Sequence, residues 1–280
     1  MSALIFDCDG VLADTERDGH LAAYNQTFAE FGLPLRWTEA DYAVKRNIGG
    51  GKERLTSVLT PEFIRQTALP ADPQAQQKIV SRWHHRKTQI FTGLVVDGAM
   101  PARPGIARIA AEALDRGWKL AVASTSASRS VHAVLRAAVG DELAAAFAVF
   151  AGDVVPRKKP APDIYLYSLK QLAMSAEDAL VIEHSRSGLL AATAAGLRCV
   201  VTPSTFTKEE PMDEALLVVT SLGDPAGERS TILANRARLY IDDHVRMADL
   251  ARCLSQGRPP SFVNRSTVRK APIASPDSHL

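Results

Sequence analysis

The segment Ala3-Leu-Ile-Phe-Asp7-Cys-Asp9-Gly10 joins a short apolar run to two aspartates that are one residue apart. The apolar run predicts a buried strand, and the turn that follows it can aim both carboxyl groups into one pocket. Gly10 permits this turn because glycine has no Cβ. A calcium loop would also need an oxygen ligand two residues beyond Asp9 and a closing glutamate, but Val11 and Asp18 stand there. We therefore expect catalytic chemistry at the end of a strand.

Three further segments carry polar residues in positions that suit a shared site. Two of them end apolar runs, and one places a lysine beside a predicted helix start. The segments are Lys119-Leu-Ala-Val-Ala-Ser124-Thr125, Lys158-Lys159-Pro-Ala-Pro-Asp163 and Ala179-Leu-Val-Ile-Glu183-His184-Ser185. In order and spacing, the four segments together resemble the four motifs of the haloacid dehalogenase superfamily of phosphohydrolases. The resemblance extends over roughly the first 220 residues.

Short apolar runs alternate with helix-like stretches along most of the chain. This alternation predicts an α/β fold in which helices cover a parallel sheet. The motif residues follow the carboxyl ends of the runs, where open α/β sheets bind ligands. The runs are residues 3–6, 119–123, 148–150, 180–182, 199–202 and 217–219, and helix-like stretches include 106–116 and 187–195.

The long gap between the first two runs is helical in character, with amphipathic stretches over residues 20–31 and 75–91. A helical cap inserted after the first strand is the natural prediction. The resemblance implies a Rossmann-like core with a cap of the C1 type. We expect core segments 1–14 and 94–223, a cap 15–93, a C-terminal extension 224–255 with a helix over 242–254, and a disordered basic tail 256–280.

Composition agrees with a soluble enzyme, because 280 residues that are 46% hydrophobic and 23% charged can bury a sizeable core. The net charge of +2 points to no particular class of partner. No run is long enough to span a bilayer, and the first run meets Asp7 too early for a signal peptide. The widely spaced Cys8, Cys199 and Cys253 suggest neither disulfides nor a zinc cluster. We expect a cytoplasmic monomer that binds a small molecule, with no nucleic-acid or membrane partner.

The resemblance implies phosphoryl transfer through a covalent intermediate. Asp7 would attack phosphorus to give an aspartyl phosphate, and Asp9 would protonate the leaving oxygen and then deprotonate water. Ser124 would hold phosphoryl oxygens, and Lys159 would neutralise charge on Asp7 and on the transferred group. Taken alone, Ser124 would suit a helix cap and Lys159 an exposed loop. Relatives that cleave carbon–halogen bonds generally lack the second acid, so Asp9 favours phosphate chemistry.

The fourth motif departs from the superfamily pattern. That pattern includes Mg²⁺ bound by Asp7, the Asp9 carbonyl and a motif-four aspartate, but this chain has His184 in place of the aspartate, beside Glu183. Magnesium prefers oxygen ligands, so its affinity should fall. Three hypotheses remain: Glu183 takes over ligation, His184 recruits a softer metal such as Mn²⁺, Co²⁺ or Zn²⁺, or most activity is lost. A helix-capping role for His184 is compatible with the first.

The segment Gly49-Gly-Gly-Lys52-Glu-Arg54 is the most distinctive part of the predicted cap. Its glycines allow close backbone approach and its cations suit a second, non-reacting phosphate, although a charged helix start is the alternative. Together with His85-x-Lys87-Thr-Gln and Thr202-Pro-Ser, it resembles the CbbY-type phosphatases, which dephosphorylate xylulose-1,5-bisphosphate. The resemblance implies substrate contact by Asp14, Tyr42, Gly50, Gly51, Lys52, Arg54, Lys87 and Thr125. Alternatively, Lys87 and His85 lie on a solvated helix face, and His20 serves packing.

The sequence therefore predicts a metal-dependent phosphatase that acts on a small sugar phosphate, with xylulose-1,5-bisphosphate as the first candidate and Mg²⁺ or Mn²⁺ as cofactor. A mutase of the β-phosphoglucomutase kind shares the motifs and cap class but returns the phosphoryl group to the sugar. A non-catalytic sugar-phosphate-binding protein is a third hypothesis because of His184. Phosphate release separates the first hypothesis from the second, and binding without metal-dependent turnover would identify the third.

Overall fold

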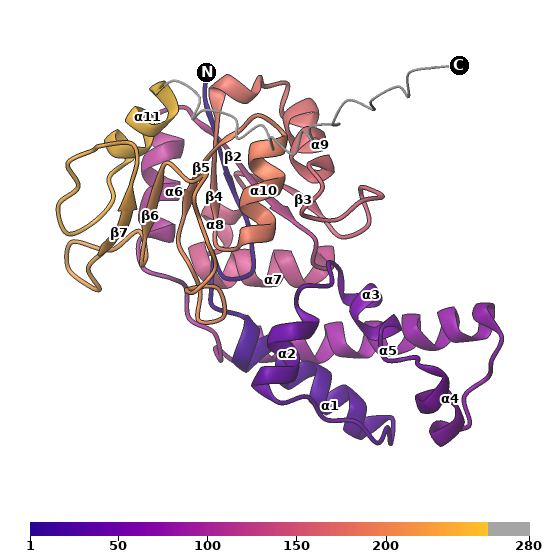
Figure 1. Ribbon diagram of the computed structural model, residues 1–280. Helices are drawn as coiled ribbons and strands as arrows, with labels where there is room; N and C mark the ends of the chain where they lie inside the picture. Colours follow the sequence, from indigo (N-terminus) through magenta and orange to yellow (C-terminus); the bar gives the residue numbers. More distant parts are fainter. Residues whose placement is uncertain (257–280) are drawn as a thin grey trace, which may run out of the picture.

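The structure is a computed structural model that describes residues 1–256. Its strands are β1 (Ala3–Phe6), β2 (Lys119–Ser124), β3 (Phe147–Ala151), β4 (Ala179–Glu183), β5 (Arg198–Val201), β6 (Leu217–Val219) and β7 (Ile232–Asn235). They form one sheet in the order β3-β2-β1-β4-β5-β6-β7 (Figure 1). Neighbouring strands are parallel from β3 through β6, and β7 pairs antiparallel with β6 at one edge.

Helices cover both faces of this sheet. They are α6 (Ile106–Asp115), α7 (Ser128–Val139), α8 (Asp141–Ala144), α9 (Asp163–Leu172), the short η2 (Ala176–Asp178), α10 (Arg186–Ala194) and α11 (Met247–Ser255). Leu4 and Phe6 of β1 belong to the core that includes residues of α6, α7 and α11. Ala3 and Ile5 belong to the opposite core, with residues of α9 and α10. Because successive strand residues point to opposite faces, a central strand covered on both sides must be apolar throughout.

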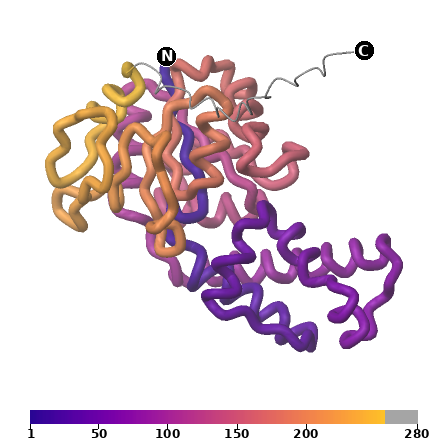
Figure 2. The backbone as a smooth tube through the Cα atoms, in the orientation of Figure 1, coloured from indigo at the N-terminus to yellow at the C-terminus, as the bar shows by residue number. Residues whose placement is uncertain are grey.

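A helical cap lies between β1 and β2 in the sequence. It consists of η1 (Glu16–Leu21), α1 (Ala22–Glu30), α2 (Glu39–Lys45), α3 (Gly51–Thr56), α4 (Pro61–Thr67) and α5 (Pro73–Val96). Figure 2 shows it as a separate lobe that two chain segments connect to the α/β core. The cap has its own apolar core, in which Tyr24, Phe28, Trp37 and Tyr42 pack closely. The two connecting segments meet at a bridge between Ala13 and Ala102.

The structure confirms the predicted α/β fold with an inserted helical cap, and it differs from the sequence analysis in three details. The edge strand β7 was not expected. The last helix begins at Met247 rather than at 242, because Arg246 and Asp249 form its N-terminal cap. Helix α5 continues beyond Gly93 to Val96. The predicted disordered tail lies, from residue 257 onward, outside the described residues. No helix in the described part combines the length and apolar character that crossing a membrane requires.

Candidate active site

A cavity of about 350 Å³ lies between the cap and the carboxyl ends of the central strands. Asp7 and His184 directly follow β1 and β4, Ser124 ends β2, and α5 contributes Lys87 from the cap. Parallel strands bring the three core residues to one edge because all their carboxyl ends point the same way. The backbone N–H of Asp7 donates to the carbonyl of Ile182 at 2.9 Å, which ties the end of β1 to the end of β4.

Lys159 connects the acids of the first and fourth motifs. Its Nζ lies 2.9 Å from Asp7 Oδ1 and 2.7 Å from Glu183 Oε1, and it also donates to the carbonyl of Ala123 at 3.0 Å. Burial alone would lower the pKa of Lys159, but the charges of Asp7 and Glu183 raise it above its usual value. Lys159 is therefore an ammonium group beside Asp7, as the charge-neutralising role requires.

Glu183 is fully buried and has four hydrogen-bond donors around its carboxylate. Lys159 Nζ and the hydroxyl of Tyr165, at 2.6 Å, donate to Oε1. The backbone N–H groups of His184, at 2.9 Å, and Ser185, at 3.4 Å, donate to Oε2. Burial raises the pKa of Glu183, but Lys159 and His184 more than offset this and hold it well below its usual value. The carboxylate is thus ionised and fixed in place.

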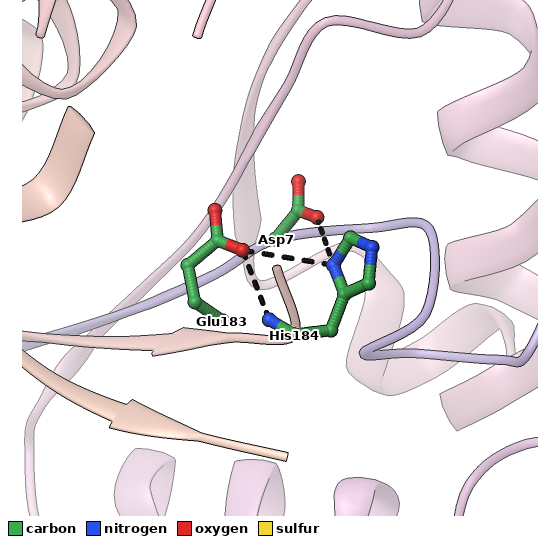
Figure 3. Close-up of side chains that lie close together, drawn as sticks. All are labelled: Asp7, Glu183 and His184. Atoms are coloured by element: carbon green, nitrogen blue, oxygen red, sulfur yellow. Dashed lines mark hydrogen bonds and ion pairs between the residues drawn. The ribbon is translucent and has the colours of Figure 1, made fainter. Parts of the chain in front are cut away.

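The ring of His184 faces both carboxylates (Figure 3). Its Nδ1 is 3.0 Å from Asp7 Oδ2 and 3.6 Å from Glu183 Oε2. Burial alone would lower the pKa of His184, but hydrogen bonding and the charges of Asp7 and Glu183 raise it to about 10. Gly10 leaves room for the ring, since a Cβ at that position would lie 2.3 Å from a ring carbon. Asp7, Glu183 and His184 together place three possible metal-ligand atoms within 4.8 Å of one another.

Asp9 accepts hydrogen bonds from three side chains. Thr15 donates to Oδ1 at 2.7 Å, His20 Nε2 lies 2.9 Å from the same oxygen, and Ser126 donates to Oδ2. Burial raises the pKa of Asp9, but the charge and hydrogen bond of His20 and the two hydroxyl groups hold it well below its usual value. Asp9 is therefore ionised in this arrangement.

His20 also contacts Lys87, which lies on α5. Lys87 Nζ is 2.6 Å from His20 Nδ1 and 4.8 Å from the ring centroids of both Tyr24 and Phe91. Burial lowers the pKa of Lys87 to about 7. One line of polar contacts therefore runs from Lys87 in the cap through the two ring nitrogens of His20 to the second acid, Asp9. Lys87 is buried, and the alternative of a solvated helix face is wrong for it.

The end of β2 and the loop after it place Ser124, Thr125 and Ser126 on the cavity wall. Ser124 is buried, and its hydroxyl accepts from the backbone N–H of Ser126 at 3.1 Å. This loop leads directly into α7, whose N-terminal N–H groups make the region favourable for an anion. The arrangement suits phosphoryl oxygens, and Ser126 joins it to Asp9.

Two ion-pair groups join the cap to the core. Lys52 Nζ lies 2.6 Å from Asp153 Oδ2, and Lys158 Nζ lies 3.0 Å from Asp153 Oδ1. Separately, Arg46 pairs with Glu210. These contacts keep the cap over the cavity in this structure. Lys52 itself lines a neighbouring cavity of about 240 Å³ rather than the main one.

Two of the residues predicted to contact substrate form hydrogen bonds within the cap in this structure. Tyr42 is fully buried, and its hydroxyl donates to Glu16 and accepts from Arg54 Nη1 at 2.9 Å. The rest of the Arg54 guanidinium donates to the carbonyls of Lys45, Arg46 and Ile48. Arg54 therefore holds the loop that leads to Gly50, although it also reaches the cavity wall.

The structure brings most of the predicted site residues to the main cavity. Its lining includes Asp7, Asp9, Gly50, Gly51, Arg54, Lys87, Ser124, Thr125, Lys159 and His184. Tyr42, Lys52 and Glu183 lie behind or beside this lining, and Asp14 accepts instead from the backbone and hydroxyl of Thr205. Sequence reasoning did not select Ser126, although the Ser-Thr-Ser run after β2 signals it. It assigned His20 to packing, and no spacing rule predicts the contact with Asp9.

Comparisons with known proteins agree with this geometry. Residues 1–196 match the haloacid dehalogenase-like hydrolase family. A CBBY-like protein from Arabidopsis thaliana is 42% identical over 228 residues, which make up 81% of this chain and 71% of that protein. The plasmid CbbY protein of Cupriavidus necator is 42% identical over 246 residues, or 86% of this chain and 94% of that protein.

A solved structure is similar as well. It shows a mutant of CbbY from Rhodobacter sphaeroides in complex with xylulose-1,5-bisphosphate, with a TM-score of 0.70 and 37% identity. The match covers 81% of this chain and 97% of the solved one. The chain therefore belongs to the haloacid dehalogenase-like hydrolases, as a phosphatase with CbbY proteins among its relatives.

Proposed function

We propose that this chain hydrolyses a small sugar phosphate through an aspartyl-phosphate intermediate, with xylulose-1,5-bisphosphate as its preferred substrate. The position of Asp7 carries the proposal. Its carboxylate is buried at the wall of the cavity, with an ammonium group 2.9 Å from Oδ1 and the second acid, Asp9, at the same cavity. The similarity to a CbbY mutant in complex with xylulose-1,5-bisphosphate supports the choice of substrate.

In the first half-reaction Asp7 attacks phosphorus, so that a bond from its carboxylate oxygen to phosphorus forms and the bond to the sugar oxygen breaks. Lys159, beside Asp7 Oδ1, neutralises charge on the transferred group. The departing sugar oxygen takes a proton from Asp9. Because Asp9 is ionised in this arrangement, that proton must first reach it; an imidazolium at His20, whose Nε2 lies 2.9 Å from Asp9, can give it the proton and become a neutral imidazole.

In the second half-reaction water attacks the phosphorus of the aspartyl phosphate. Asp9 removes a proton from that water, a role that suits its lowered pKa. The bond between Asp7 and phosphorus then breaks, phosphate leaves and the Asp7 carboxylate is restored. Closure of the cap over the cavity, through pairs such as Lys52–Asp153, keeps other water away from the intermediate.

Hydrolases of this family generally use a divalent metal, and the cluster around Asp7 suits one. The resemblance implies that Asp7, the Asp9 carbonyl and the fourth motif would hold it, with Glu183 and His184 as the fourth-motif candidates. When bound there, a divalent cation would stabilise the negative charge that gathers around phosphorus.

Cationic side chains on the cavity wall support a bisphosphate over a monophosphate. Arg46, Arg54 and Lys87 reach the cavity from the cap, and Arg186 reaches it from the start of α10. A phosphate that does not react needs such partners, because charge-assisted hydrogen bonds hold it in place and leave the other phosphate for Asp7.

Phosphate release from a panel of sugar monophosphates and bisphosphates tests the proposal, with Mg²⁺, Mn²⁺, Co²⁺ and Zn²⁺ supplied separately. We expect the ketopentose bisphosphate to be hydrolysed fastest. Asp7→Asn should abolish release, whereas Asp115→Asn, at the exposed end of α6, should leave it unchanged. Release that survives in Asp7→Asn would refute the aspartyl-phosphate mechanism.

Other outcomes would identify the two remaining hypotheses. Isomerisation of a sugar phosphate without phosphate release would identify a mutase. Binding of a sugar phosphate with every metal present, and no turnover, would identify a binding protein. A cytoplasmic location and a monomeric state stay predictions, which fractionation and sedimentation can test.

A further inference from the structure

The imidazole of His184 presents a buried nitrogen to two carboxylates. Its Nδ1 lies 3.0 Å from Asp7 Oδ2 and 3.6 Å from Glu183 Oε2, and neither contact has the alignment of a good hydrogen bond. Figure 3 shows this nitrogen directed at Asp7 and Glu183. An imidazole nitrogen beside a carboxylate oxygen can share either a proton or a metal ion, and a metal ion that binds there displaces the proton.

The distances fit a cation of ordinary size. Two ligand atoms at about 2.1 Å from one metal, and at right angles to each other, are about 3.0 Å apart. Asp7 Oδ2 and His184 Nδ1 are 3.0 Å apart. Both atoms can therefore bind the same ion without any movement of the backbone. The pair supplies one carboxylate oxygen and one imidazole nitrogen.

Glu183 is not free to join them. An ionised carboxylate offers roughly four lone-pair sites, and the four donors around Glu183 occupy them. Nor can its side chain swing aside, because α10 packs against it so closely that a Cβ at Gly188 would lie 1.9 Å from Oε1. Glu183 thus positions Lys159 and the backbone of His184, and does not replace the missing carboxylate as a metal ligand.

We propose that the metal site of this chain is a mixed oxygen and nitrogen site, in which Asp7 Oδ2 and His184 Nδ1 are the side-chain ligands, and which selects a first-row transition-metal dication over Mg²⁺. Imidazole binds such ions well, whereas Mg²⁺ favours oxygen ligands only. The inference rests on the proposed function for the use of the ion in turnover. Binding itself is independent of turnover and is tested first.

The test measures binding of each metal to the full chain by calorimetry, without substrate. We expect Mn²⁺ and Co²⁺ to bind at least about tenfold more tightly than Mg²⁺, because the nitrogen ligand favours them. Bound Mn²⁺ should also show coupling to a ¹⁴N nucleus by pulsed electron paramagnetic resonance. In His184→Asp the nitrogen coupling should disappear and the preference should shift towards Mg²⁺ by about tenfold or more. His85→Asp, on the exposed side of α5, should change neither result.

The outcomes separate this inference from the proposed function. Mg²⁺ affinity equal to that of Mn²⁺, with no nitrogen coupling in the wild-type protein, would overturn the mixed site even if phosphate is released. Failure of every ion to bind would overturn it too. Nitrogen coupling without turnover of any sugar phosphate would support the site and refute the phosphatase. If His184→Asp fails to fold, the nitrogen coupling of the wild-type protein still decides the question.

Discussion

Replacement of Gly188 by alanine should damage the protein through its contact with Glu183. A Cβ at this position would lie 1.9 Å from Glu183 Oε1 and 2.0 Å from the carboxyl carbon, far inside the normal contact distance. The end of a glutamate side chain usually moves aside easily. Here Lys159, Tyr165 and two backbone N–H groups hold it, so the methyl group can be accommodated only if some of these bonds break.

The change in the free energy of unfolding can be estimated from these hydrogen bonds. Alanine is favoured over glycine inside a helix by about 1 kcal/mol. A hydrogen bond to a charged group contributes about 1.5–3 kcal/mol, so the loss of two costs about 3–6 kcal/mol. The net effect of Gly188→Ala is a decrease of about 2–5 kcal/mol in the free energy of unfolding. Turnover should fall as well, because Lys159 and His184 are positioned by the same carboxylate.

Urea denaturation of Gly188→Ala and Gly93→Ala provides a matched comparison. Both glycines are helical, but a methyl group at Gly93 of α5 would meet no atom of residues 1–256 within 4 Å apart from its chain neighbours and the backbone of its own helix. Gly93→Ala should therefore gain about 0.5–1 kcal/mol in stability and keep full phosphate release. If Gly188→Ala is as stable and active as Gly93→Ala, the Glu183 carboxylate is free to move, and its role as a fixed anchor is refuted.

Burial lowers the pKa of Lys87 to about 7, so the folded state binds fewer protons than the unfolded state from pH 7 to about 10, and stability rises with pH there. Lys87→Met removes this dependence. The free energy of unfolding of Lys87→Met, measured relative to that of the wild type, should therefore fall with rising pH by up to about 1.4 kcal/mol per pH unit. A difference that stays constant with pH, or the same trend in the exposed Lys78→Met, would contradict this. Arg103 donates to the carbonyls of Gly10, Thr202, Pro203 and Thr220, so Arg103→Lys should lose about 2–4 kcal/mol in urea denaturation; an unchanged midpoint would show that these carbonyls find other donors. Asp9→Asn should reduce phosphate release by about 10²–10⁴-fold without a change in circular dichroism, and near-normal release would exclude Asp9 as the acid and base.

The sequence predicts that the catalytic residues of the α/β core lie close together, because the strands of a parallel sheet all point the same way. Asp7, Ser124 and His184 each follow an apolar run, and parallel strands end at one edge of the sheet. By contrast, β7 gives no such signal. Its four residues are exposed or half-buried, and only pairing with β6 defines them as a strand. A short edge strand has no buried face to impose an alternating pattern.

The surroundings of individual side chains could not be predicted in the same way. Nothing in the spacing indicates that Tyr165 of α9 reaches Glu183, because that contact depends on how the helix packs on the sheet. Lys87 lies among charged and polar residues in the sequence, yet His20 and two aromatic rings surround it in the cap. Contacts between distant segments are tertiary, and they decide which polar residues are buried.

The insertion of the cap after β1 also has a consequence for how the chain folds during synthesis. Strand β1 leaves the ribosome well before its partners in the sheet, because Ala3 pairs with Lys119 on one side and with Ala179 on the other. The aromatic residues of the cap core, from Tyr24 to Trp83, have all been synthesised before β2 and β4. We expect the cap to fold first, while an unpaired apolar β1 waits for β2 and for the closure of a loop of more than a hundred residues. Until that loop closes, the segment that carries the nucleophile is the part of the nascent chain most exposed to misassembly.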